Sequence, residues 1–467
     1  MDESFLNPLS FGHGDPIAPV ILGVTGILLF AVIGRFLARH FGQPTVVGEL
    51  FMGIALGNIA WLLGIDLITI LREGSRVFEI TQYSLAGIPI DQAATAIFGE
   101  GSSDEIVRII SGPAGAEILQ VASTVDVFSR YGVIFLLFMV GLETDIHQMR
   151  KVGGPSIRVA IIGVALPFAL GFAAARVLMP ELGVNTVLFI AATLGATSVG
   201  ISANVLRELG RNQSREGNII LGAAVCDDIL GLVILAVVSG IVVSGSVNVV
   251  DVALVITTAL LFLFGTAALG PTIVRFAARM MSRLHFVEAK MFTSYLFVMI
   301  LAWIANLAGL ATIVGAFAAG VVLSDTFFNE YEVGKKKVVS IRELIMPLEV
   351  ILVPIFFILM GIQVKLESFT SWPVIVVAGG LLVAAIFGKL ASGLGAGQTA
   401  DKLVIGIGMM PRGEVGLVFA AIGRTLGAID DAMFSAVVLM VMVTTLISPP
   451  LLKAAVIRQT ARESLAG

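Results

Sequence analysis

Residues 217–243 read GNIILGAAVCDDILGLVILAVVSGIVV, an apolar run that carries two adjacent aspartates, Asp227 and Asp228, near its middle. A helix needs roughly 20 mostly apolar residues to cross ~30 Å of hydrocarbon, so this run is predicted to be a membrane-spanning helix. An ionisable side chain deep in such a helix costs at least ~2.5–3.5 kcal/mol on insertion scales, and its presence therefore points to a function.

The composition of the whole chain indicates a membrane protein. Of its 467 residues, 57% are hydrophobic and 13% are charged, and the mean hydropathy is +1.00. In soluble domains about a quarter of the residues are charged. The charged residues of this chain are too few to cover its apolar surface in water. The single cysteine, Cys226, excludes an internal disulfide, and no Cys/His cluster suggests a metal site. We expect no enzyme activity, no cofactor and no nucleic-acid partner.

A window of spanning length predicts about thirteen membrane spans, so the fold class is an all-α integral membrane protein that forms a single membrane domain over residues 1–467. The predicted spans lie near residues 18–38, 45–63, 126–143, 156–178, 185–206, 217–243, 251–274, 291–309, 311–327, 345–363, 373–395, 402–424 and 432–455.

Charges in the connections predict the orientation. One side carries Lys and Arg, as at Arg35, residues 335–337 and Arg458, whereas connections on the other side, such as 180–185, are poor in both. The positive-inside rule then places the N-terminus outside, the C-terminus in the cytoplasm and the long connection 64–125 on the outer side. The start lacks a basic leader region, so the first apolar segment is expected to stay. The expected location is a bacterial inner membrane or, in a cyanobacterium, the thylakoid.

An odd number of spans permits an internal symmetry. Spans one to six and eight to thirteen are predicted to form two six-helix repeats of opposite orientation, as in many secondary transporters. Glycine-interrupted segments at 194–200 and 411–416 occupy matching places in the two halves.

The two aspartates are suited to ion exchange. Neighbours on a helix point about 100° apart, so one carboxylate can face a cavity while the other meets a partner on another helix. A helix-packing hydrogen bond is the alternative, but Ser, Thr or Asn would provide that at lower cost. A buried carboxylate binds a proton readily and is also a hard oxygen ligand for a small cation. Proton and cation would therefore compete for one site.

Lys389 is the second candidate, late in the span 373–395. One interpretation is a lysine that extends its ammonium to the membrane interface, since it lies near a helix end. The other is an ammonium paired with Asp227 or Asp228. Both remain open at this point.

Two spans are predicted to be interrupted. In the segment MPRGEVG at 410–416, proline and two glycines free backbone groups that can survive only beside protein or water. Arg412 and Glu414 could neutralise the facing half-helix dipoles or form a local ion pair. The segment GATSVG at 195–200 is the partner break, where Thr197 and Ser198 offer oxygen ligands. Three further acids in or beside spans are assigned no transport role: Glu49, Glu143 and Glu349.

Several segments together resemble the monovalent cation:proton antiporter-2 family, most closely its NapA-like Na+/H+ antiporters. They are QPTVVGEL at 43–50, FMVGLETD at 138–145, ATSVGI at 196–201, LGAAVCDDILG at 221–231, GAFAAGVVLSD at 315–325 and PRGEVGL at 411–417. The resemblance implies a thirteen-helix fold with two discontinuous crossing helices, and a homodimer. It also implies a core part (156–243 and 373–455) that slides against a dimerisation part (18–143 and 291–363).

The resemblance further implies roles for single residues. Asp228 would bind Na+, with Asp227 and Thr197 as possible further ligands. Asp227 and Lys389 would form an ion pair linked to electrogenic exchange, and the Asp-Asp pair favours the Na+-type branch. The expected function is therefore exchange of Na+ or Li+ for H+ by alternating access.

Three alternatives were weighed. K+/H+ exchange or K+ efflux belongs to the same broad class, although no nucleotide-binding tail of the Kef type follows the last span. An intramembrane aspartyl protease needs two aspartates on separate helices, whereas Asp227 and Asp228 are consecutive. A passive channel does not explain paired buried carboxylates together with a lysine.

Overall fold

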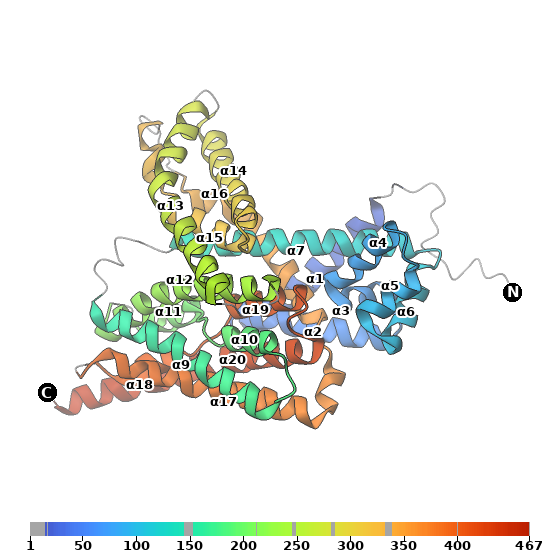
Figure 1. The fold of residues 1–467 in the computed structure, drawn as a ribbon. Helices are drawn as coiled ribbons and strands as arrows, with labels where there is room; N and C mark the ends of the chain where they lie inside the picture. Colours follow the sequence, from blue (N-terminus) through green and yellow to red (C-terminus); the bar gives the residue numbers. More distant parts are fainter. Residues whose placement is uncertain are drawn as a thin grey trace.

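The computed structural model describes residue 15 and residues 17–143, 153–211, 213–244, 249–281, 285–331, 339–398 and 400–466. Every regular element within these residues is a helix, which confirms the predicted all-α class (Figure 1). The basic segment 335–337, used above to predict orientation, lies outside the described residues.

Ten helices in the described part of the chain are long and apolar enough to cross a membrane. They are α1 (Ala18–His40), α2 (Thr45–Leu62), α7 (Gly115–Glu143), α9 (Gly154–Leu178), α12 (Arg215–Ser244), α13 (Val249–Met281), α14 (Phe286–Leu307), α16 (Ile341–Ile362), α17 (Trp372–Ser392) and α20 (Asp431–Ala466). Each lies at one of the predicted spans, because a long apolar run is itself the signal for a spanning helix.

The other three predicted spans are shorter than a continuous spanning helix. Segment 185–206 is the pair α10 (Val184–Thr193) and α11 (Val199–Glu208), and segment 402–424 is the pair α18 (Lys402–Gly408) and α19 (Glu414–Thr425). Segment 311–327 is α15 (Thr312–Val322), followed by the 3-10 helix η3 (Asp325–Tyr331). A hydropathy window averages over a break in the backbone, so it reports one span where two helices meet.

The long connection is helical and shorter than predicted. It contains α3 (Asp66–Glu73), η2 (Gly74–Arg76), α4 (Val77–Leu85), α5 (Ile90–Phe98) and α6 (Glu100–Ile110). Helix α7 begins at Gly115 rather than near residue 126, so the partly apolar stretch after Gly115 is the first part of a long helix. The connection therefore ends before Gly115 rather than at the predicted residue 125.

The helices pack in two groups. Helices α9 to α12 and α17 to α20 pack on one another and are called the crossing bundle here. Helices α1, α2, α7 and α13 to α16 form the second group, called the α7–α16 bundle, and α3 packs on it through α2, α7 and α16. Figure 1 shows α9, α17 and α20 together in the lower part and α13, α14 and α16 in the upper part. These groups contain the segments predicted for the core and dimerisation parts, whose roles stay predictions.

Candidate functional site at two broken helices

The breaks in the two interrupted spans lie against each other in the crossing bundle. The α10–α11 break covers residues 194–198, and the α18–α19 break covers residues 409–413. Three hydrogen bonds join them: Ser198 N to the Pro411 carbonyl at 2.9 Å, Thr197 Oγ1 to the Met409 carbonyl at 3.3 Å, and Ser202 Oγ to the Gly408 carbonyl at 2.5 Å. The carbonyl groups freed in one span are therefore satisfied by donors from the other.

Arg412 binds the carbonyl groups around these breaks. Its guanidinium is fully buried and donates to the carbonyls of Ala196 at 3.2 Å and Ala385 at 3.3 Å. The Thr445 hydroxyl donates in turn to the Arg412 carbonyl. A cation in this place can compensate the negative end of the half-helix α10, and this role of Arg412 stays a prediction.

Glu414 is the first residue of α19, where an acid compensates the positive end of a helix. Its carboxylate accepts a hydrogen bond from Ser198 Oγ at 3.0 Å, so the second break also caps this helix. A Cβ on Gly413 would lie 2.9 Å from Ser198 Cβ, which is too close for any side chain. Arg412 and Glu414 bond to the opposite break; no hydrogen bond joins them to each other among the described residues.

Asp227 of α12 and Lys389 of α17 form a buried ion pair. Lys389 Nζ lies 2.9 Å from Asp227 Oδ1, and both side chains are 0% exposed. The interfacial interpretation of Lys389 is therefore wrong, because its ammonium turns into the crossing bundle. The second carboxylate oxygen of Asp227 has no hydrogen-bond partner among the described residues, although the Thr197 hydroxyl is within reach of this carboxylate. A buried pair of this kind is strongly destabilised when one partner is removed.

Two glycines bring α9 and α17 together beside the pair, and sequence reasoning did not select either. A Cβ on Gly163 of α9 would lie 3.3 Å from Ser392 Cβ of α17, and at an ordinary contact distance of 3.6 Å from Lys389 Nζ. A Cβ on Gly388 would lie 2.7 Å from Pro167 Cα, so α9 and α17 cross with their backbones almost in contact. The signal that could have found Gly388 is its position next to Lys389 in an apolar helix.

Asp228 lies on the same helix but in different surroundings. It is 8% exposed, and its carboxylate has no hydrogen bond or ion pair within the described part of the chain. Three charged groups act most strongly on the Asp228 carboxylate. The carboxylates of Asp227 and Glu414 repel its negative charge, and the Lys389 ammonium attracts it. One aspartate is therefore held by a protein cation, while no protein cation pairs with the other among the described residues.

Two of the acids without a transport role have structural partners. Glu49 of α2 is buried and pairs with Arg35 of α1. Glu143, the last residue of α7, pairs with Arg342 at 2.6 Å at the start of α16. Both bonds join neighbouring helices of the α7–α16 bundle.

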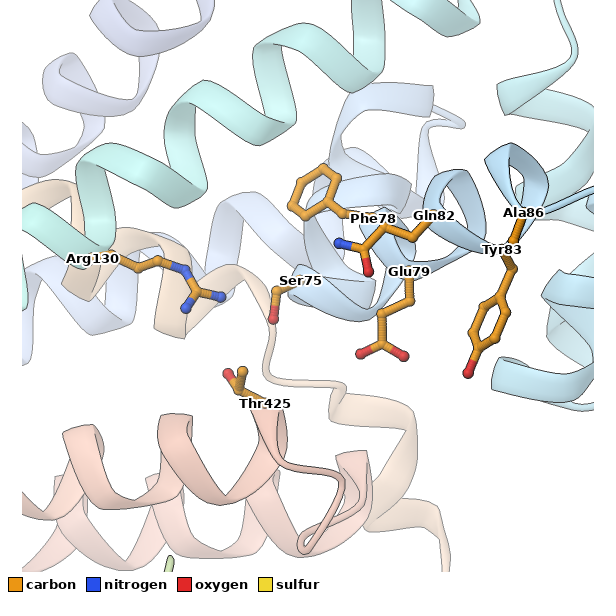
Figure 2. Close-up of a pocket in the computed structure, with 8 residues that line it drawn as sticks. All are labelled: Ser75, Phe78, Glu79, Gln82, Tyr83, Ala86, Arg130 and Thr425. Carbon is orange, nitrogen blue, oxygen red and sulfur yellow. The ribbon is translucent and has the colours of Figure 1, made fainter. Parts of the chain in front are cut away.

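A cavity of about 470 Å3 lies between the two bundles, with walls from α7, α12, α16 and α19 that include Ser129, Ser239 and Ile422. A second cavity, of about 650 Å3, is lined by η2, α4, α7 and the end of α19. Figure 2 shows Glu79 and Tyr83 of α4 facing it, with Arg130 and Thr425 on its other sides. Arg130 and Thr425 line both cavities, which therefore adjoin. Asp228 lines neither of them.

This combination defines a class: a membrane transporter with a charged site where two broken helices meet. The chain matches the family described as sodium/hydrogen exchanger, transmembrane, over residues 105–458, and it belongs to that family. The family consists of transporters rather than catalytic enzymes. This result confirms the predicted resemblance to monovalent cation:proton antiporters.

Relatives of the chain carry matching names. It is 35% identical over 455 residues to the high-affinity Na+/H+ antiporter NhaS3 of Synechocystis, which covers 94% of this chain and 91% of that protein. It is also 35% identical over 355 residues to the Na+/H+-K+ antiporter GerN of Bacillus cereus. That match covers 74% of this chain and 87% of GerN. The solved structure of the sodium proton antiporter MjNhaP1 of Methanocaldococcus jannaschii has the same fold, with a TM-score of 0.60 and 16% sequence identity. The superposition covers 94% of this chain and 98% of MjNhaP1.

Proposed function

We propose that the protein exchanges Na+ or Li+ for H+ across a membrane, by alternating access and without ATP. The observation that carries the proposal is the contrast between the two adjacent aspartates. Asp227 is paired with Lys389 at 2.9 Å, whereas Asp228 has no protein partner among the described residues. A carboxylate without a counter-ion in a buried site binds either a proton or a small cation, and this competition is the minimum that an exchanger requires.

In this proposal Na+ binds to Asp228, and Asp227 and Thr197 supply further oxygen ligands. Arg412 and Glu414 keep the two broken helices together, so that the site retains its shape while it is empty. The site lies inside the crossing bundle, whereas the cavities lie between this bundle and the α7–α16 bundle. A movement of the crossing bundle would therefore carry the whole site from one face to the other.

The Asp227–Lys389 pair makes the proposed exchange electrogenic. When Na+ binds at the aspartates it competes with the Lys389 ammonium for the Asp227 carboxylate. The ammonium, left in a buried place without an anion, then releases its proton more readily. A second proton per cycle moves net charge across the membrane.

The remaining architecture is part of the proposal. Counting α15 and the two broken pairs as spans gives the thirteen predicted spans and allows two inverted repeats of six. The α7–α16 bundle would then form the homodimer contact, with the N-terminus outside the cell and the C-terminus in the cytoplasm. A bacterial inner membrane or a thylakoid would house the protein.

K+/H+ exchange is the second candidate function. The observation that favours it is the printed name of the Bacillus relative, which includes both Na+ and K+. A carboxylate site can accept either ion, because the ligand atoms are oxygens in both cases.

We expect the purified protein, reconstituted in proteoliposomes with an imposed pH gradient, to dissipate that gradient when Na+ or Li+ is added. Addition of K+ at the same concentration should have a smaller effect. The measurement is the fluorescence of a pH-sensitive dye inside the vesicles, with protein-free vesicles as the control. A response to K+ that exceeds the response to Na+ would establish the second candidate, and no response to any of the three ions would contradict exchange altogether.

A further inference from the structure

A cluster of charged side chains lies at one end of the molecule, where α3, the α16–α17 connection and the α19–α20 turn come together. Its side chains are largely withdrawn from water, with exposed fractions of 3% for Arg72, 11% for Glu73, 15% for Lys365, 5% for Arg424 and 22% for Asp431. We call these five residues the interbundle cluster. Charges at this depth are tolerated only when each one is paired.

One side of the cluster belongs to the α7–α16 bundle. The Arg72 guanidinium lies 2.7 Å and 2.8 Å from the two carboxylate oxygens of Glu367 and 3.1 Å from Asn58 Oδ1. It also lies 4.3 Å from the centre of the Trp61 ring. These bonds tie α3 to α2 and to the 3-10 helix η4 (Leu366–Thr370), which lies in the α16–α17 connection and packs against α17 and α20.

Other bonds of the cluster join α3 to α19 and α20, either directly or through Lys365 of the α16–α17 connection. Arg424, near the end of α19, donates from Nη2 to the Arg72 carbonyl at 2.7 Å. Lys365 Nζ lies 2.7 Å from Glu73 Oε1 and 2.7 Å from Asp431 Oδ2. Asp431 also accepts from Arg424 at 2.6 Å. Asp431, the first residue of α20, is therefore shared by a cation of its own bundle and by a cation of the connection.

The backbone adds two features at the same place. The Lys365 amide donates to the Ser435 hydroxyl of α20 at 3.1 Å, and this hydroxyl is fully buried. Gly74, which ends α3 with a φ of +69°, has no side chain where the Arg424 guanidinium passes. A Cβ there would lie 2.8 Å from Arg424 Nη1. The end of α19 thus fits closely against the end of α3.

Such a set of bonds is compatible with a single relative position of the two bundles. Hydrogen bonds and ion pairs near 2.7 Å are lost when their atoms separate to beyond about 3.5 Å, so a small displacement of α19 and α20 past α3 breaks several at once. The displaced state would leave Asp431, Arg424 and Glu73 to find water or new partners.

We propose that the interbundle cluster is a latch, which stabilises the present access state and must open once in every transport cycle. Asp431 and Lys365 then set the balance between the two access states, although they lie outside the ion site. This inference rests on the alternating access proposed above.

The test uses the full-length protein in proteoliposomes of known orientation, with Na+ applied to one face at a time. A weaker latch lowers the population of the present state, so the apparent Na+ affinity falls at the face open in that state and rises at the opposite face. In Asp431→Asn we expect the ratio of the two apparent affinities to change on the order of tenfold, a typical coupling between sites. Ser435→Ala removes the uncharged bond from the Lys365 amide, together with a bond within α20 to the Asp431 carbonyl, and should shift the ratio in the same direction by less.

Two matched variants complete the test. Asp66→Asn removes a carboxylate from the same helix α3, whose bond to Arg108 of α6 at 3.3 Å stays outside the crossing bundle, and its affinity ratio should equal the wild-type ratio. Asp431→Glu keeps the negative charge and should lie closer to wild type than Asp431→Asn does. The melting temperature of each variant is measured alongside, because a cluster that only stabilises the fold would lower it without changing the ratio.

Three outcomes would overturn the latch. An unchanged ratio in both Asp431→Asn and Ser435→Ala would show that the cluster is only structural. Equal weakening of affinity at both faces would show damage to the ion site instead. If the wild-type protein exchanges no monovalent cation at all, the proposed function and the latch fail together, whereas exchange with an unchanged ratio removes the latch alone.

Discussion

Asp228→Asn is expected to abolish cation/proton exchange while leaving the protein folded. The amide has no exchangeable proton in the accessible range and no anionic oxygen, so both ions lose their ligand in one substitution. The carboxylate has no hydrogen bond or ion pair within the described residues, so its replacement breaks no structural contact seen there. Removing an uncompensated charge from a buried place should leave the melting temperature equal to or above that of the wild type.

The measurement is Na+-driven proton flux in proteoliposomes, together with size-exclusion chromatography and the melting temperature in detergent. Asp401→Asn is the matched control, because Asp401 caps α18 in the same bundle and asparagine can cap a helix as well. We expect that variant to exchange ions at close to the wild-type rate. Exchange near wild type in Asp228→Asn would remove this residue as the binding site.

Lys389→Gln is expected to remove the charge movement that accompanies Na+ exchange. The ammonium is the group proposed to carry the second proton, and glutamine carries none. Any exchange that remains in this variant should be electroneutral. The substitution also leaves Asp227 buried without its counter-ion, and breaking a buried pair in this way costs about 3–5 kcal/mol unless the carboxylate takes up a proton. The melting temperature should therefore fall.

The measurement compares charge movement on a solid-supported membrane with proton flux in the same preparation. Lys453→Gln is the control, since Lys453 lies in the same bundle but is 52% exposed and pairs with Glu208 at 3.4 Å. Its charge per Na+ should match the wild type. If Lys389→Gln also keeps the wild-type charge per Na+, Lys389 has only a structural role as the partner of Asp227.

The sequence predicted the positions of the spans because long apolar runs leave few alternatives in lipid. It also predicted both helix breaks, since proline and glycine at 411–416 and glycine at 195 and 200 cannot continue a helix without loss. Several boundaries differ from the prediction: α7 begins at Gly115 rather than near 126, α15 ends at Val322, short of 327, and α20 continues to Ala466, past 455. A hydropathy window reports the apolar part of a helix, whereas the helix itself continues into its polar ends.

Some of the site residues can be predicted from the sequence pattern alone, whereas others depend on tertiary contacts. The paired aspartates stand out in any apolar helix, whereas Lys389 lies late in α17 and could equally have reached the interface. Its partner Asp227 lies on α12, far away in the chain, and both α12 and α17 pack on α9. The interbundle cluster was not predicted at all, because its charges lie near helix ends, where solvated residues are common.

The central claim is that one buried carboxylate binds either Na+ or H+, and the most direct test is the pH dependence of Na+ binding to the purified protein. Binding is measured by calorimetry in the wild type and in Asp228→Asn, over a range of pH that extends both above and below the pKa of the site. The account predicts that the apparent Na+ affinity of the wild type falls by about tenfold for each pH unit below the pKa of the site, and is constant above it. A wild-type Na+ affinity that is the same across this whole range, or Na+ binding that survives in Asp228→Asn, would contradict the account.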